Sequence, residues 1–139
     1  MIRAVIDTNT LVSGLISPQG VPAQIIGHWQ AGNFLLITSP TLLAELRRVL
    51  EYPRVAARLG WSEPERARFL NSLTTLALVT PGSLQLPGVT RDPHDDAVVV
   101  CAVEGRAAFL VSGDQDLLVL RQYQGVRMVT PREFLSLLE

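Results

Sequence analysis

The stretch Arg91–Val103, RDPHDDAVVVCAV, places three aspartates within five positions, directly before a run of apolar residues. Asp92 precedes Pro93, and Gly105 follows about a dozen residues later, which is the pattern of a helix start and a helix end. The valine run suits a buried strand equally well by periodicity alone. The capping residues favour a helix, so this segment predicts an acidic helix start followed by buried turns.

Short β-branched runs alternate with helical patterns along the rest of the chain. Predicted strands cover residues 3–7, 34–38, 108–113 and 126–130, and residues 76–80 read as a strand or a helix end. Predicted helices cover residues 8–17, 22–32, 40–52, 63–73, 92–105 and 115–123, with a terminal helix capped by Thr130. This alternation predicts a single α/β domain over residues 1–139, a Rossmann-like three-layer α/β/α sandwich with a central parallel sheet.

Composition limits the functional classes. No apolar run reaches the roughly 18 residues of a membrane span, and the first residues lack the layout of a signal peptide. Cys101 is the single cysteine, which excludes an intrachain disulfide and fits a reduced cytoplasm. The net charge of −1 creates no global field that attracts nucleic acid. We therefore expect a cytoplasmic protein without a membrane partner.

The aspartates gather in three short stretches, VIDTN, RDPHDD and VSGDQDL. They are Asp7, Asp92, Asp95, Asp96, Asp114 and Asp116. Each stretch lies at a predicted strand end or helix start, where one aspartate serves as a cap, and we interpret Asp92 as a cap. The additional carboxylates repel one another by about 1 kcal/mol per pair at 4 Å in water and about 4 kcal/mol at a dielectric of 20. A divalent cation with hard oxygen ligands, Mg²⁺ or Mn²⁺, relieves that repulsion.

The ends of parallel strands meet at one edge of a sheet, where ligands bind at the point of strand-order reversal. VIDTNTLVSGL, SPTLLAELRRVL, RDPHDDAVVVCA and FLVSGDQDLL, in this order, together resemble the PIN-domain family. The resemblance is strongest to PIN proteins that are toxins of toxin–antitoxin pairs, and it extends from Met1 to about Phe134. It implies a Mg²⁺- or Mn²⁺-dependent endoribonuclease with an antitoxin partner and a homodimeric assembly.

The resemblance also assigns site residues. The four catalytic acids fall on Asp7, Glu45, Asp96 and Asp114. Metal binding is expected at Asp7, Asp96, Asp114 and Asp116, and supporting roles at Asn9, Asp95 and Ser112. Sequence alone indicates only a solvated helical position for Glu45, and its site role comes from the resemblance.

The expected reaction is hydrolysis of single-stranded RNA by a metal-activated water. RNA contacts are expected from Arg47, Arg48 and His94. The two arginines belong to a segment that also contains Glu51, Glu63 and Glu65, so a solvated helix face is an equal alternative to a phosphate track.

Other classes compete with this interpretation. A haloacid-dehalogenase-type phosphotransferase requires a second aspartate where this chain has Asn9, and a response-regulator receiver requires a lysine, which this chain lacks. The remaining alternatives keep the PIN fold. One is a catalytically silent RNA-binding or scaffolding module, and the other is an RNA-processing nuclease unrelated to a toxin–antitoxin pair.

Overall fold

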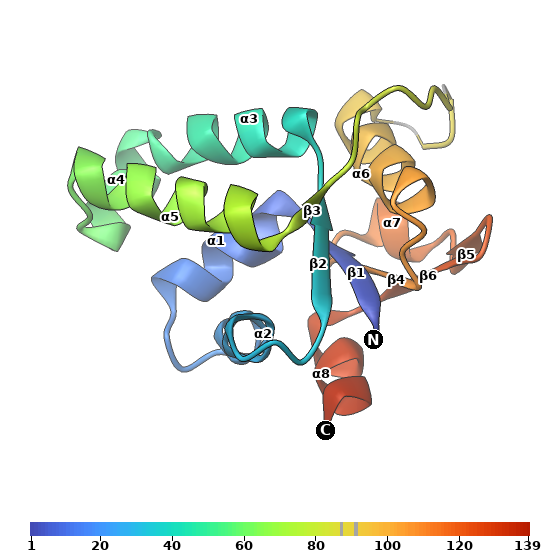
Figure 1. Cartoon of the computed structure of the whole chain (residues 1–139), viewed down its shortest axis with the longest axis horizontal. Helices are drawn as coiled ribbons and strands as arrows, with labels where there is room; N and C mark the ends of the chain where they lie inside the picture. Colours follow the sequence, from blue (N-terminus) through green and yellow to red (C-terminus); the bar gives the residue numbers. More distant parts are fainter. Residues whose placement is uncertain (87, 91) are drawn as a thin grey trace.

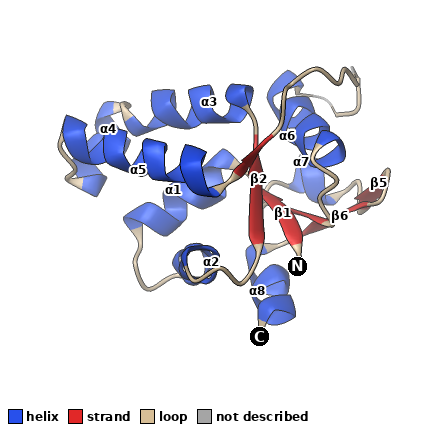
Figure 2. Ribbon diagram, viewed as in Figure 1, coloured by secondary structure: helices blue, strands red, loops and turns tan. Residues whose placement is uncertain are grey.

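The computed structural model describes residues 1–86, 88–90 and 92–139, with the side chain of His94 also outside the description. A central, mostly parallel sheet is flanked by helices on both faces (Figures 1 and 2). The strands are β1 (Arg3–Ile6), β2 (Leu35–Thr38), β3 (Leu78–Val79), β4 (Phe109–Val111), β5 (Gln122–Tyr123) and β6 (Val126–Val129). The helices are α1 (Thr8–Ile16), α2 (Val21–Gln30), α3 (Pro40–Leu50), α4 (Pro53–Leu59), α5 (Glu63–Leu76), α6 (Pro93–Glu104), α7 (Gln115–Leu118) and α8 (Pro131–Leu138).

Within the described residues the strand order is β3-β2-β1-β4-β6-β5. β1 pairs in parallel with both β2 and β4, for example Val5 with Ile37 and with Leu110. From β1 the chain proceeds to β2 and β3 on one side, and from β4 to β6 and β5 on the other. The strand order therefore reverses between β1 and β4, which is where open α/β sheets bind their ligands.

Alternate strand residues enter two separate cores. Ala4 and Ile6 of β1 face a core built with α1, α2, α3, α5 and α8. Val5, the residue between them, faces a second core that includes Val99 of α6 and Leu117 of α7. Because side chains of a strand alternate between its two faces, this division confirms the predicted three-layer sandwich.

The predicted helix at residues 92–105 is confirmed, since α6 spans Pro93–Glu104. Its valines are accommodated because this helix buries Val98 and Val99 against the sheet. The capping boxes predicted at the starts of α5 and α8 are also present, with Ser62 paired to Glu65 and Thr130 to Glu133.

The structure differs from the sequence prediction at two places. Residues 53–59, where no element is predicted, form α4, with Pro53 in its first turn and Gly60 ending it in the left-handed conformation. The predicted helix at 115–123 ends at Leu118, and Gln122–Tyr123 forms an antiparallel edge strand against β6. Within the described residues, no helix is long and apolar enough to cross a membrane.

Candidate active site

The candidate site lies beyond the carboxyl ends of β1 and β4, at the reversal of strand order. Asp7 follows β1 directly, and its backbone N–H donates to the carbonyl of Val111 at 3.1 Å, which extends the β1–β4 pairing by one residue. Ser112 follows β4, and its N–H donates to the carbonyl of Val129 at 3.0 Å. The sheet itself therefore fixes the backbone positions of both residues.

The carboxylate of Asp7 is held from two directions. Its Oδ1 accepts the N–H of Thr10 at 2.9 Å, so Asp7 caps α1. Its Oδ2 accepts the hydroxyl of Ser112 at 2.5 Å. Asp7 is 8% exposed and Ser112 is fully buried. The carboxylate is thus oriented by the fold before any ligand binds.

Ser112 links Asp7 to Asp114. The Oγ of Ser112 donates to Asp7 and accepts the N–H of Asp114 at 2.9 Å. Asp114 then caps α7, because its Oδ1 accepts the N–H of Asp116 at 2.9 Å. One buried hydroxyl therefore fixes the relative position of two acidic residues.

Three carboxylates converge beside this link. Within the described chain, Asp95, Asp114 and Asp116 each offer one oxygen, and these atoms lie within 4.8 Å of one another. Asp95 is half-buried at the start of α6, whereas the other two are exposed. We call these three residues the carboxylate cluster.

Burial and electrostatic repulsion within the site raise the pKa of Asp95. Partial burial and then the negative charges of Asp114, Asp92, Asp116 and Asp7 raise the pKa of Asp95 to about 6. Oxygen-only donors carrying several negative charges are the ligands that hard divalent cations prefer. The residues present therefore fit such a cation, which would relieve this repulsion.

Asp96 lies elsewhere. Its Oδ1 accepts the N–H of Thr90 at 2.6 Å and the hydroxyl of Thr90 at 2.8 Å. Consecutive positions on a helix point about 100° apart, so Asp95 and Asp96 cannot face the same point. The structure gathers Asp95, the residue expected to be an accessory, with Asp114 and Asp116, and it places the Asp96 carboxylate against Thr90.

Asn9 shares a hollow with two of these acids, and Glu45 lies on another element. Asn9 is exposed and lines a hollow of about 420 Å³ together with Asp7 and Asp114. Glu45 is half-buried on α3, and within the described residues it does not belong to the carboxylate cluster. Its predicted catalytic role stays a prediction.

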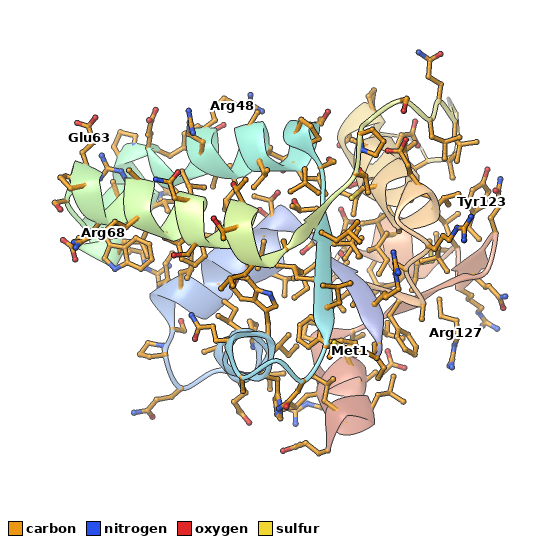
Figure 3. All side chains as sticks on the ribbon, in the orientation of Figure 1. Met1, Arg48, Glu63, Arg68, Tyr123 and Arg127 are labelled. Atoms are coloured by element: carbon orange, nitrogen blue, oxygen red, sulfur yellow. The ribbon has the colours of Figure 1, made fainter. Side chains whose placement is uncertain are left out.

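Arg47 and Arg48, two of the residues expected to contact RNA, lie on α3. Figure 3 shows Arg48 on the outer side of α3, pointing away from the sheet. Arg47 lines a hollow of about 220 Å³ between α3 and α5, which also contains Glu51, Glu63 and Arg66. This mixed charge leaves both earlier interpretations open, and the side chain of His94 lies outside the described residues.

Thr90 and Glu104 are two site-supporting residues that the sequence did not predict. Thr90 holds Asp96 as described above. The carboxylate of Glu104 accepts the N–H groups of Gly82, Ser83 and Leu84 at 2.8–3.0 Å. These contacts join residues about twenty positions apart through backbone amides, which carry no side-chain signal.

The fold and the acidic strand ends define a class of protein, and comparison with known protein families identifies that class. The sequence pattern of the PIN domain matches residues 3–116, so the chain belongs to the PIN-domain family. PIN domains are typically nucleases and usually use divalent metal ions, which agrees with the carboxylate cluster.

Individual proteins also resemble this chain. The uncharacterized protein MJ1680 of Methanocaldococcus jannaschii is 28% identical over 143 residues, covering 97% of this chain and 90% of that protein. A chain in the crystal structure of VapBC2 from Rickettsia felis, bound to a DNA fragment from their promoter, superposes with a TM-score of 0.61. That match covers 93% of this chain and 98% of the other at 13% identity, and it confirms the fold alone.

Proposed function

We propose that this protein is a Mg²⁺- or Mn²⁺-dependent endoribonuclease that hydrolyses single-stranded RNA. The observation that carries the proposal is the convergence of Asp95, Asp114 and Asp116 within 4.8 Å, beside the buried link between Asp7 and Ser112. A structural cap needs one acid per helix start, whereas this edge holds several mutually repelling acids. Such a set supports a cation site better than it supports capping.

The proposed roles follow from the geometry. Asp95, Asp114 and Asp116 hold the cation, with Asp7 as a further ligand, directly or through water. A bound divalent cation supplies positive charge that neutralises the scissile phosphate and favours deprotonation of the attacking water. Ser112 is a positioning residue, since it fixes Asp7 and the backbone of Asp114. Asn9 supports the same hollow from α1.

We propose that Asp95, rather than Asp96, is the third acid of the site. The support is that Asp95 is one of the converging carboxylates, whereas the Oδ1 of Asp96 is engaged by Thr90. Glu45 is proposed to orient or deprotonate the attacking water, on the basis of the family resemblance and its half-buried position. RNA preference comes from single-stranded shape, because attack by water does not require the 2′-hydroxyl.

The biological role that we propose is the toxin of a toxin–antitoxin pair, acting in the cytoplasm as a homodimer with an antitoxin partner. The fold shared with a chain of VapBC2 supports this role. An RNA-processing nuclease without such a partner is the competing role. Co-expression with the product of the adjacent open reading frame separates the two, because only an antitoxin restores growth that this protein arrests.

The enzymatic proposal is tested with purified protein and unstructured RNA in Mg²⁺ or Mn²⁺. Cleavage is expected, and EDTA or the Asp114→Asn substitution should abolish it. Asp92→Asn is a matched control, because asparagine caps a helix about as well as aspartate. Cleavage that persists in EDTA, or equal loss in both variants, contradicts the proposed roles.

A further inference from the structure

Another hollow lies beside the first turn of α6. It has a volume of about 360 Å³ and lies between the start of α3, the loop after β3 and α6. Its apolar walls come from Leu84, Leu86, Ala97 and Val100. This volume falls within the range of roughly 300–1,000 Å³ that is typical of sites for small organic groups. We call it the α3–α6 pocket.

The polar groups that the α3–α6 pocket offers to a ligand are limited by accessibility. Thr80 lines the pocket but is 2% exposed, and its Oγ is itself inaccessible. A ligand in the pocket therefore meets Asp96 rather than this hydroxyl.

The charge of the pocket limits what that ligand is. Asp96 and Glu104 both line it, and its described lining residues include no arginine or histidine. A phosphate is therefore repelled. The favoured ligand is a neutral, flat group with apolar faces and N–H donors at its edge, which is the chemistry of a nucleobase.

The pocket is connected to the candidate active site through consecutive residues. Asp95 belongs to the carboxylate cluster, and Asp96, whose Cα lies about 3.8 Å away across one peptide bond, lines the pocket. An RNA strand whose phosphate lies at the cluster thus brings a neighbouring base to the pocket.

We propose that the α3–α6 pocket binds an unstacked RNA base next to the scissile phosphate and selects bases by their N–H donors. This inference rests on the proposed ribonuclease function and adds its sequence preference. Guanine is the best match, because it presents adjacent imino and amino donors to the carboxylate of Asp96. Uracil, with one such donor, is the poorest match. An arginine of a protein partner also carries N–H donors, but the contiguity with the cluster favours the base.

The test measures binding without cleavage. Dye-labelled uridine hexamers that carry guanosine, adenosine, cytidine or an abasic residue at one internal position are titrated with the full-length protein in EDTA. Fluorescence anisotropy should show the guanosine hexamer binding at least about tenfold more tightly than all-uridine or abasic RNA. Ala97→Leu fills the pocket and should abolish this preference. Ala57→Leu, the same change at an exposed position of α4, should leave it intact.

Asp96→Asn provides a second variant. Exchange of a carboxylate oxygen for an amide donor should weaken the guanosine preference measured in EDTA. An undiminished preference overturns the inference. Equal binding of all hexamers also overturns the inference. A tetra-arginine peptide that binds the parent but not Ala97→Leu, while the RNAs are not discriminated, would assign the pocket to a protein partner instead and overturn it too. If the protein prefers guanosine but cuts no RNA, the base-binding pocket stands and the proposed nuclease function is wrong. If it cuts RNA without a base preference, the nuclease function stands and the base-binding pocket is wrong.

Discussion

The hydroxyl of Ser112 donates a hydrogen bond to Oδ2 of Asp7 across 105 positions of sequence. The Oγ of Ser112 also accepts the N–H of Asp114, so one buried group joins the ends of β1 and β4. Two strands that are adjacent only through the sheet topology thereby present their acids in a fixed arrangement. This link is more specific than helix capping, which needs no contact between the two strand ends.

Ser112→Ala should therefore reduce both stability and activity. It leaves the N–H of Asp114 without its acceptor and frees one oxygen of Asp7, which costs about 1–3 kcal/mol in the free energy of unfolding. Urea denaturation measures that loss. Ser136→Ala, at an exposed position of α8, is the control and should change stability little. A fully stable and fully active Ser112→Ala protein would show that the link is incidental.

Asp95→Asn and Asp96→Asn should have different effects on cleavage of all-uridine RNA. Loss of Asp95 removes a carboxylate of the cluster, and we expect at least about a 100-fold lower rate. Mutation of a residue that only hydrogen-bonds to a metal ligand already lowers activity or metal affinity by roughly 10- to 100-fold. Asp96→Asn disturbs the contact with Thr90 and should reduce the rate less. Single-turnover cleavage assays compare the two. A larger loss for Asp96→Asn would restore the original assignment of the third acid.

The choice between Asp95 and Asp96 was beyond sequence reasoning for a geometric reason. Both are aspartates in the first turn of α6, and either fits the pattern of an acid before an apolar run. Only the rotation of the helix about its axis decides which carboxylate meets Asp114. That rotation is set by the packing of Val98 and Val99 against the sheet, which a motif does not encode.

The layers and the strand-end acids were predictable because they depend on periodicity and capping. Asp7, Ser112 and Asp114 follow buried strands that are visible as apolar runs. Short elements were less predictable, because their signals are weak. β5 has two residues, and its pairing with β6 depends on the positive φ angles of Arg121 and Gln124, which allow the chain to turn.

The metal-free protein should lose stability as the pH rises through the titration of Asp95. Partial burial and the charges of Asp114, Asp92, Asp116 and Asp7 raise the pKa of Asp95 from its ordinary value of 3.8 to about 6. The folded state thus binds this proton more tightly than the unfolded state between these values, and ionisation opposes folding. Thermal melts in EDTA from pH 4 to pH 7 should show that Asp95→Asn gains stability relative to the parent. A gap between the two proteins that narrows with rising pH is the opposite result.

Glu104 should matter for the loop after β3. Burial alone would raise the pKa of its carboxyl group, but the N–H groups of Gly82, Leu84 and Ser83 outweigh that effect and lower the pKa. A lowered pKa contributes stability above the ordinary value of 4.5, and this contribution disappears as the pH falls through the folded-state value. Glu104→Gln should therefore accelerate proteolysis of residues 81–86 at neutral pH and matter less in acid, whereas Glu139→Gln should have no effect. Identical cleavage rates for the parent and Glu104→Gln at neutral pH would show that these hydrogen bonds do not hold the loop.

The most direct measurement of the central claim is thermal unfolding of the parent and Asp95→Asn across a Mn²⁺ and Mg²⁺ titration. If the carboxylate cluster exists to hold a divalent cation, the parent gains stability as RT ln(1 + [M]/Kd), about 2.7 kcal/mol at a hundred times Kd. Asp95→Asn should melt above the parent in EDTA, because one repelling charge is gone, and should lose most of the response to metal. A parent melting curve that does not move at millimolar metal, with Asp95→Asn no more stable in EDTA, would contradict the account and leave the aspartates as helix caps.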